Sequence, residues 1–353
     1  MLSLPPSTGF YPTLPFLHIA QKDRTIRLGS LWAIPKMESL KGGDILRIFH
    51  AALCQKADHL PSGHLDMDPF FHYRAPDPEA EVWFDQRYQA AGLIRSQDYE
   101  TILMGTSLAA NYRPLWFDAF YDTTTVKVTF PNGGFHEFTQ ALDYAYETHD
   151  VKRVIFGLDP NILCRSVEEA PDELPAYLYD ANPWNDGPYL FNKDVLIRSL
   201  YVLREKAAGN TQALQDAFLW DGDVFFSKEL ALASYPRPEP TGTVEPSDAF
   251  LDICQENLQV VEGWLEAHPD TQFVFYYSPY SILFWDKMER LGQTDAMIEM
   301  LKYATAQLLT YDNAEVQCFL TDTDIITDLD NYADHIHVAG RITYRMAQAM
   351  PGG

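Results

Sequence analysis

Three side chains that together perform acyl transfer stand at two places in the chain. Near its end, Asp334 precedes His337 by three residues in the stretch Asp-Asn-Tyr-Ala-Asp-His-Ile-His. This spacing lets one tight loop bring a carboxylate and an imidazole to the same side. Ser107 follows the apolar run 101–104 and a glycine, which is typical of a sharp turn after a buried strand. The two stretches together predict a Ser–His–Asp apparatus.

Each predicted member of this apparatus has a defined task. A serine hydroxyl is a weak nucleophile at neutral pH and needs an adjacent base, for which His337 is the candidate. Asp334 would hold the imidazole in the useful tautomer and stabilise the cation that forms during the reaction. An oxyanion needs fixed donors, and the backbone N–H groups of Ser107 and Gly134 could supply them. Gly133 and Gly134 form a turn at which the backbone can approach a substrate closely.

The elements that must position these groups alternate between strands and helices. Apolar or β-branched runs predict five strands, at residues 101–104, 125–130, 152–157, 272–277 and 316–320. Helical periodicity and capping residues predict helices at residues 108–120, 135–148, 193–208, 247–267, 294–309 and 339–350. This order indicates parallel strands joined by crossover helices. The expected fold is therefore α/β, a three-layer sandwich around a parallel five-stranded sheet.

In open parallel sheets, functional groups gather in the loops at the carboxyl ends of the strands. One edge of the sheet is therefore predicted to carry all the candidate site residues: Ser107, Gly133, Gly134, Asp159, Asn161, Asp334 and His337. The agreement of the whole set is stronger evidence than any single motif.

The chain has 353 residues, enough for one large α/β domain with additions. We interpret residues 1–66 as an N-terminal extension and residues 67–353 as the main domain. Within the main domain, residues 161–246 are rich in Pro, Asp, Tyr and Trp and interrupt the alternation, so we expect an insertion over the edge of the sheet. Its aromatic residues could stack on sugar rings or form a small core of their own: Tyr177, Tyr179, Trp184, Tyr189 and Trp220.

Composition excludes several classes of partner. The formal net charge of -24 opposes binding to nucleic acids and anionic lipid surfaces. The four cysteines form no Cys-x-x-Cys pair, so neither a zinc site nor a disulfide framework is indicated. No stretch approaches the ~18–20 apolar residues of a membrane span, and the start lacks the pattern of a signal peptide, so we expect the chain as given to be soluble.

Other candidate ligand sites are incomplete. His335 and His337 form a His-x-His pair without a third ligand, so we expect His335 to point away from the site. The acidic segment 322–330 lacks the glycine and terminal glutamate of an EF-hand, which favours a solvated loop. The Gly133-Gly134 turn could hold a phosphate, but no nucleotide-binding fingerprint accompanies it. We predict no metal ion and no cofactor.

Four blocks spread over residues 68–350 together resemble the SGNH (GDSL-like) hydrolase superfamily. They are Gly105-Thr106-Ser107, Gly133-Gly134, Gly157-Leu158-Asp159-Pro160 and Asp334-x-x-His337. Segments 99–107 and 177–183 look most like uncharacterised bacterial SGNH-like proteins linked to cell-envelope polysaccharides. The resemblance implies a serine esterase, acyltransferase or deacetylase that acts on an acylated carbohydrate or envelope polymer. It also implies a location at the cell envelope, because many relatives carry a membrane anchor ahead of the segment matching residues 68–73.

One block departs from the family pattern. Where the family usually has an asparagine that donates to the oxyanion, this chain has Asp159. A carboxylate repels an oxyanion unless it is protonated or turned away, and Asn161 is an alternative donor. A second hypothesis is therefore a catalytically impaired SGNH-fold protein that binds carbohydrate. A third is a phosphate-handling enzyme that uses the glycine turn.

Overall fold

The computed structural model describes residues 68–166, 174–180, 182, 186–222 and 224–352. All described residues belong to one compact unit, within residues 62–353. The predicted N-terminal extension, residues 1–66, and Trp184 lie outside the described residues. The boundaries proposed for the extension and the insertion remain predictions.

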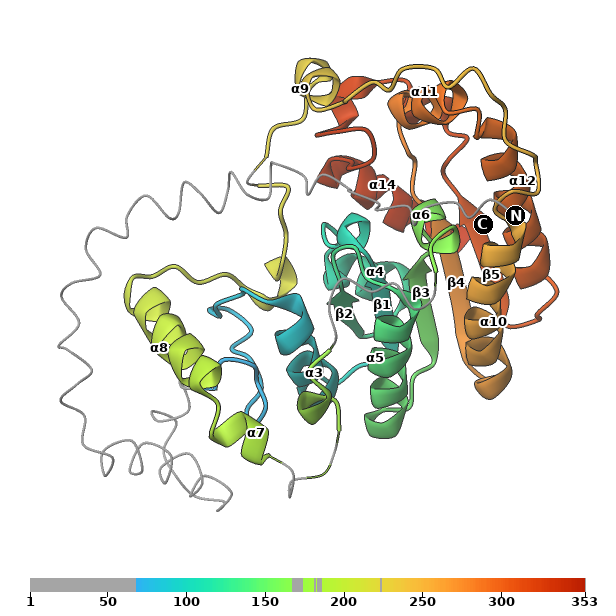
Figure 1. Ribbon diagram of the computed structural model, residues 1–353. Helices are drawn as coiled ribbons and strands as arrows, with labels where there is room; N and C mark the ends of the chain where they lie inside the picture. Colours follow the sequence, from blue (N-terminus) through green and yellow to red (C-terminus); the bar gives the residue numbers. More distant parts are fainter. Residues whose placement is uncertain (1–67, 167–173, 181, 183–185, 223, 353) are drawn as a thin grey trace, which may run out of the picture. The chain divides into compact units, whose positions relative to one another are not determined.

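Five parallel strands form one sheet in the order β2-β1-β3-β4-β5 (Figure 1). The strands are β1 (Thr101–Gly105), β2 (Thr125–Thr129), β3 (Arg153–Gly157), β4 (Gln272–Tyr277) and β5 (Ala314–Cys318). The predicted α/β fold with a parallel five-stranded sheet is confirmed. The strand order makes β1 and β3 neighbours, so the turns that follow them, with Ser107 and Asp159, also lie side by side.

Successive side chains of the three inner strands, β1, β3 and β4, enter two separate hydrophobic clusters. On β1, Ile102 and Met104 belong to one cluster and Leu103 to the other, and all three are fully buried. Full burial of such a side chain contributes roughly 1.5–3 kcal/mol. Because both faces are apolar, both need a helical cover, as is usual for parallel sheets. The result is the predicted three-layer arrangement.

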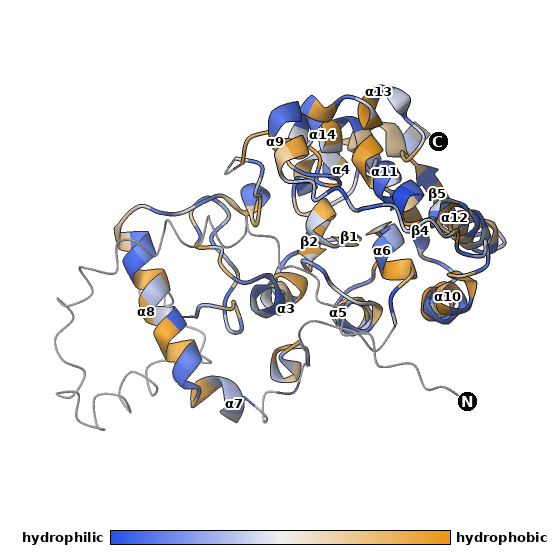
Figure 2. Cartoon of the chain, turned by 45° about the horizontal axis from the view of Figure 1, so that its top comes forward, coloured by the Kyte–Doolittle hydropathy of each residue, from blue (hydrophilic) through white to orange (hydrophobic). Residues whose placement is uncertain are grey.

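The helices divide between the two faces. The first cluster packs against α3 (Gln86–Ser96), α5 (Phe135–Thr148), α10 (Leu251–Ala267) and α12 (Thr294–Leu308). The second packs against α4 (Pro114–Tyr121) and α14 (Gly340–Ala349). The remaining helices are α6 (Pro160–Leu163), α7 (Gly187–Leu190), α8 (Lys193–Ala207), α9 (Lys228–Ala233), α11 (Ile282–Arg290) and α13 (Thr323–Ile326). Helices α5 and α10 carry both hydrophobic and hydrophilic residues in Figure 2, as expected for helices that cover a sheet.

Two predicted helix starts were wrong. The helix expected from residue 108 begins only at Pro114, because residues Ser107–Ala109 form a separate 3-10 turn, η4. The helix expected from residue 247 begins at Leu251, after a turn in which the Ala249 N–H donates to the carbonyl of Pro246. Helices α3 and α11 were not predicted.

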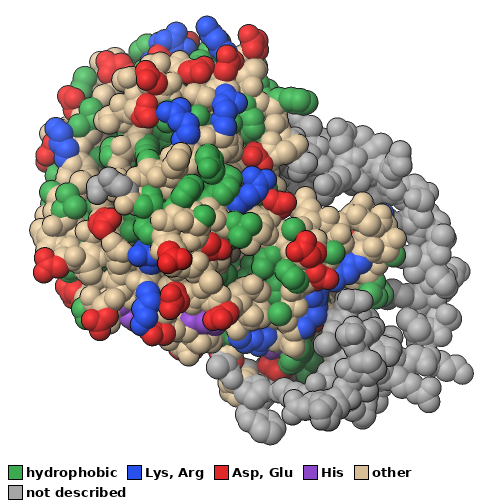
Figure 3. Space-filling model, turned by 180° about the vertical axis from the view of Figure 1, so that it is seen from behind, with side chains coloured by type: hydrophobic (Ala, Val, Ile, Leu, Met, Phe, Trp, Pro, Cys, Tyr) green, Lys and Arg blue, Asp and Glu red, His purple; other side chains and the backbone are tan. Residues whose placement is uncertain are grey.

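Charged residues of both signs are interspersed over the face of the molecule shown in Figure 3. This face therefore offers no concentrated basic patch of the kind that tracks a phosphate backbone. In the described part of the chain, none of the helices has both the length and the apolar character that a membrane crossing requires.

Gly157 ends β3 at a point where a larger residue does not fit. A Cβ atom there would lie 2.7 Å from the hydroxyl oxygen of Tyr276, a fully buried side chain. We expect Gly157→Ala to lower the free energy of unfolding by about 1–3 kcal/mol, since overpacking a rigid core forces neighbours to shift. Urea unfolding measures this change. Gly263→Ala is the matched control: a Cβ atom there meets open space on the exposed face of α10, so the change should be neutral or stabilising. Equal stability of the two variants would contradict the packing argument.

Candidate active site

The structure brings Ser107, His337 and Asp334 together across 230 residues of sequence. The Ser107 Oγ lies 2.9 Å from His337 Nε2, and His337 Nδ1 lies 2.7 Å from Asp334 Oδ2. Both distances are within hydrogen-bond reach. Because an ionised carboxylate can only accept, Nδ1 carries the proton and Nε2 is left to accept from the serine hydroxyl. This is the geometry in which an imidazole can take the proton of a nucleophilic serine.

The loop that carries Asp334 and His337 is fixed by its own backbone. Tyr332 and Val338 form an antiparallel bridge, and the Ala333 N–H donates to the carbonyl of His337 at 3.0 Å. Asp334 Oδ1 accepts from the N–H groups of both Ile336 and His337 at 2.8 Å. The spacing of three residues therefore closes a tight loop, with one carboxylate oxygen holding the backbone and the other holding the imidazole.

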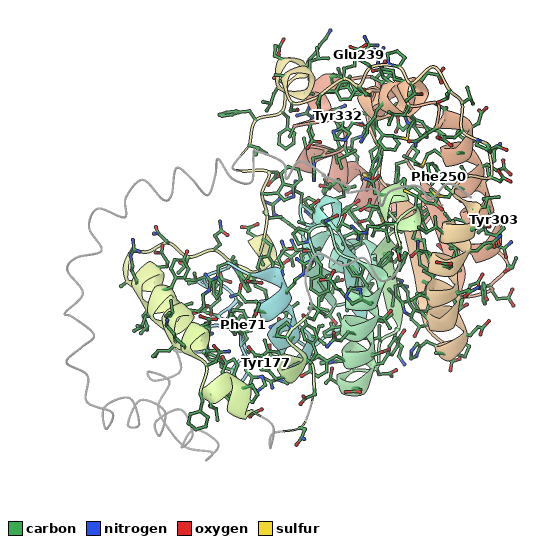
Figure 4. The ribbon with its side chains drawn as sticks, in the orientation of Figure 1. Phe71, Tyr177, Glu239, Phe250, Tyr303 and Tyr332 are labelled. Atoms are coloured by element: carbon green, nitrogen blue, oxygen red, sulfur yellow. The ribbon has the colours of Figure 1, made fainter. Side chains whose placement is uncertain are left out.

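Tyr332 anchors the same loop to the sheet. Its side chain is fully buried, and its hydroxyl donates to the carbonyl of Pro279 at 2.6 Å, just beyond the end of β4. Tyr332 lies among the C-terminal elements in Figure 4. The loop that holds the imidazole is thereby attached to the carboxyl end of a central strand.

Burial and neighbouring charge have opposite effects on the pKa values of Asp334 and His337. Burial would raise the pKa of Asp334, but the charge and hydrogen bond of His337 and the two backbone N–H groups hold it well below its usual range. Burial would lower the pKa of His337, but the Asp334 carboxylate, with a smaller contribution from Asp159, raises it above its ordinary value. Asp334 is therefore ionised at neutral pH and favours the imidazolium that proton transfer creates.

Ser107 opens the η4 turn directly after β1. The strand ends at Gly105, where a Cβ atom would lie 2.8 Å from that of Ala109, so the turn doubles back closely on the strand. Thr106 caps the turn, and its hydroxyl oxygen accepts weakly from the Leu108 N–H at 3.4 Å. Among the hydrogen bonds of the described residues, none uses the Ser107 N–H. That N–H is therefore available to an oxyanion, and its role as a donor remains a prediction.

A buried lysine holds the chain just beyond the nucleophile. Lys127 on β2 is 4% exposed, and its ammonium donates to the carbonyls of Ala110 at 2.7 Å and Tyr112 at 2.8 Å. These bonds take up two carbonyls between η4 and α4. They explain why the segment does not form the continuous helix that the sequence predicted. The position of this lysine next to the nucleophile turn was not predicted from the sequence.

Lys127 should make stability depend on pH. Burial lowers its pKa to about 7 in the folded chain, whereas the unfolded chain keeps the ordinary lysine value of about 10.4. Between these values the unfolded state binds the extra proton, so stability rises with pH. We expect the difference in unfolding free energy between wild type and Lys127→Met to change by about 2 kcal/mol from pH 7.5 to 9, in favour of wild type. Urea unfolding at several pH values measures it, and a constant difference would contradict the expectation.

Asp159 lies beside the nucleophile turn. Strand β3 pairs with β1 from Thr101↔Arg153 to Met104↔Phe156, so the segments that follow the two strands, with Thr106 and Asp159, leave the same edge of the sheet. The Asp159 carboxylate accepts a short hydrogen bond from the Thr106 hydroxyl. Burial raises its pKa to about 6, against the opposing effects of Thr106 and of the charge of His337. This carboxyl group is thus part of the site and titrates close to neutrality.

The expectation that Gly134 supplies a second oxyanion donor is not met by this geometry. Its N–H donates at 2.8 Å to the carboxylate of Glu137, three residues later in the first turn of α5. The Gly133 N–H donates to the carbonyl of Phe130, also at 2.8 Å. Both donors are therefore used within the turn itself, which also removes the basis for a phosphate site there. Asn161 follows β3 as predicted but is exposed on the short helix α6.

Trp220 contacts both ends of the Ser–His pair. Its indole N–H donates to the carbonyl of Ser107 at 3.0 Å, and its ring meets the His337 ring edge-on with centroids 5.2 Å apart. The Trp220 and Asp221 backbone N–H groups both donate to the Asn111 side chain at 3.1 Å. The predicted insertion therefore forms one wall of the site. From the sequence, we expected this tryptophan to stack on a sugar ring or to belong to a small core. Its contacts with Ser107 and His337 were not predicted.

Two other aromatic residues of the insertion, Tyr179 and Tyr189, have partners elsewhere in the fold. Tyr189 lies within ring-contact distance of Phe70, His72 and Tyr73, and its hydroxyl bonds to Asp68. Tyr179 is buried, and its hydroxyl donates to the carbonyl of Arg87. These contacts favour the interpretation that they form a small core.

The neighbouring acidic and histidine residues have structural partners. Asp322 and Asp328 cap short helical turns, and Asp330 accepts from the Lys228 N–H. The His335 ring lies near Tyr235, with centroids 6.2 Å apart, and burial lowers its pKa to about 4. Over the described ranges, no three His, Cys, Asp or Glu residues converge as metal ligands.

Comparison with known proteins adds little to this geometry. No protein-family model matches the sequence, and no curated protein matches it. A solved chain from Streptococcus pneumonia, provisionally described as a platelet activating factor, aligns with 75% of this chain and 88% of its own length. The aligned residues are 10% identical, and the TM-score is 0.37. At this level of similarity, nothing about the activity of the present chain follows from that neighbour.

Proposed function

We propose that this chain is a serine hydrolase or acyltransferase of the SGNH type, acting on ester bonds. The observation that supports the proposal most is the continuous hydrogen-bonded chain from Ser107 Oγ through His337 to Asp334, at 2.9 and 2.7 Å. Ser107 lies 230 residues before His337 in the sequence, and it meets the Asp334–His337 loop at the carboxyl edge of the sheet. A structural role alone does not require this order of nucleophile, base and orienting acid.

The proposed reaction has two halves. Ser107 Oγ attacks the ester carbonyl while its proton passes to His337 Nε2, and the negative charge on the carbonyl oxygen is met by the Ser107 N–H. The imidazolium then protonates the leaving alkoxide, which departs as an alcohol and leaves an acyl-enzyme. In the second half, His337 takes a proton from water or an acceptor hydroxyl. The oxygen of the water or acceptor attacks the acyl carbon, and the bond from that carbon to Ser107 Oγ breaks while His337 returns its proton to Oγ. This releases an acid or a new ester and restores the Ser107 hydroxyl and neutral His337.

The finer substrate assignment depends on the resemblance described above. An acylated carbohydrate or cell-envelope polymer, with a small acyl group such as acetyl, is the substrate class that it implies. Trp220 offers an aromatic surface beside the Ser–His pair, and aromatic rings commonly bind sugars. The contact of Trp220 with His337 is compatible with a sugar next to the scissile ester.

Two substrates test the two parts of the proposal, the ester chemistry and the substrate class. Saturable hydrolysis of p-nitrophenyl acetate, lost in His337→Ala, is expected if the ester chemistry is correct. Release of acetate from an acetylated polysaccharide is expected if the substrate class is correct. Ser96→Ala, at the end of α3, serves as a matched serine control and should retain activity. Activity on neither substrate, or activity that survives loss of His337, would exclude the hydrolase.

A second candidate is a carbohydrate-binding protein with impaired catalysis. Asp159 favours it, because a buried carboxylate next to the nucleophile turn opposes a second negative charge. The engagement of the Gly134 N–H favours it as well, since one predicted oxyanion donor is lost. Calorimetric binding of an oligosaccharide without turnover, unchanged by Ser107→Ala, would support this candidate over the enzyme.

A further inference from the structure

Asp159 is a buried titratable group that the Ser–His–Asp mechanism leaves without a task. It is 4% exposed and sits at the N-terminal end of α6, yet its side chain makes no capping bond to that helix. Its carboxylate is instead directed to other elements. It accepts from Thr106, the residue before the nucleophile, and the Tyr280 hydroxyl, in the turn after β4, also acts to lower the pKa of Asp159.

The groups around Asp159 come from every element that packs against it. They are Thr106, Tyr112, Tyr276, Tyr280, Arg165 and His337. Arg165 is the nearest permanent cation of this set, but its guanidinium bonds to Asn132 and to the carbonyl of Gly133. The hydrogen-bond partner of Asp159 is therefore the neutral Thr106 hydroxyl, and the charge of His337 acts on the same carboxyl group.

This arrangement places a possible negative charge on a side chain that contacts Thr106, the residue before the nucleophile, and that acts on the charge of His337. The tetrahedral intermediate formed at Ser107 would carry a second negative charge, on the oxygen of the attacked carbonyl. Both charges would lie in a buried, weakly screened region, where like charges repel strongly. The charge on Asp159 disappears when its carboxyl is protonated, whereas the charge on the tetrahedral intermediate is unavoidable. Building on the proposed function, we propose that acyl transfer at Ser107 proceeds with Asp159 in its neutral form. Ionisation of Asp159 then lowers the activity at alkaline pH.

The sign of the effect follows from two titrations. Attack requires neutral His337, so activity rises as pH passes through the raised pKa of His337. Neutral Asp159 is lost as pH rises through about 6. The pH dependence of kcat/KM should therefore be bell-shaped, with the reactive form a minority at every pH. Asp159 acts here as a positioning residue that controls charge, without direct transfer of its proton.

Asp159→Asn tests this proposal because it keeps the size and removes the charge. The alkaline limb of the pH profile should disappear, and kcat/KM for p-nitrophenyl acetate should rise by up to about 100-fold at pH 8 with little change at pH 5. Asp143→Asn is the matched control, since burial also raises the pKa of that aspartate, on α5. It should leave the profile of the wild type unchanged.

Thr106→Val provides a second test that retains the carboxyl group. The Thr106 hydroxyl stabilises the ionised form of Asp159, so its removal should raise the pKa of Asp159. The alkaline limb should then move to higher pH. This variant remains informative if Asp159→Asn does not fold.

The outcomes separate this proposal from the proposed function. Ester hydrolysis by the wild type with an alkaline limb that is unchanged in both variants would overturn the role of Asp159 and leave the hydrolase standing. A lower kcat/KM at every pH in Asp159→Asn would also overturn it. No hydrolysis and no reaction of Ser107 with a fluorophosphonate at any pH would overturn the hydrolase itself. An alkaline limb lost in Asp159→Asn and displaced in Thr106→Val would establish both.

Discussion

Replacement of Ser107 by alanine should lower kcat for ester hydrolysis by at least about 10⁴-fold, to the level that oxyanion stabilisation and binding alone can support. The Ser107 hydroxyl is the atom within 2.9 Å of His337 Nε2, so its loss removes the nucleophile while the imidazole stays in place. Steady-state kinetics with p-nitrophenyl acetate measure the change. KM should change far less than kcat, because the substrate contacts remain.

The serine substitution needs a check that the fold is intact. Ser107 lies in a short 3-10 turn, and its Oγ bonds to His337, so the unfolding free energy should change by no more than about 1–2 kcal/mol. Ser96→Ala provides the comparison for loss of a helical hydroxyl. Turnover within tenfold of the wild type in folded Ser107→Ala would show that the reaction occurs elsewhere.

Asp334→Asn should be the second most damaging substitution, with kcat lowered by about 10⁴-fold. The carboxylate accepts three hydrogen bonds, from His337 Nδ1 and from the N–H groups of Ile336 and His337. An amide can keep the backbone bonds, but its NH₂ group would face the imidazole and favour the tautomer with a protonated Nε2. That nitrogen could no longer accept the serine proton.

The pH profile distinguishes this electrostatic effect from simple misplacement of the imidazole. Asp334 is the main group that raises the pKa of His337 against the effect of burial. In Asp334→Asn that pKa should fall, so the acid limb of the residual activity should move to lower pH. The loss of stability should shrink as pH falls below about 4, since the folded-state pKa of Asp334 is depressed and its stabilisation is lost on protonation. An unmoved acid limb would show that Asp334 does not act on the charge of His337.

The parts of the fold that the sequence predicted correctly are those with local signals. The run of apolar residues in β1 and the β-branched alternation of β2 predicted buried strands, and the alternation of element types predicted parallel pairing. The Asp334–His337 spacing belongs to this group as well, because a carboxylate three residues before a histidine closes its own loop. One local signal was overlooked, since a glutamate three residues after Gly134 commonly bonds back to the start of a helix.

The contacts that were not predicted depend on the tertiary fold. Lys127 reaches the carbonyls of Ala110 and Tyr112 only because β2 lies beside β1. Thr106 meets Asp159 through the register of β1 with β3, and Trp220 meets Ser107 across 113 residues. Helix α3 was not predicted. Its buried side includes a glycine, Gly92, which packs directly against Phe70 and Phe71 where a helix pattern usually has a large apolar side chain.

Covalent labelling is the most direct measurement of whether Ser107 is an activated nucleophile. The protein is incubated with a fluorophosphonate, digested, and analysed by mass spectrometry to locate the adduct. A single adduct on Ser107, formed in the wild type and absent in His337→Ala, is the expected result. No adduct in the wild type, an adduct on another serine, or labelling of Ser107 that is equally fast without His337 would contradict the proposed site.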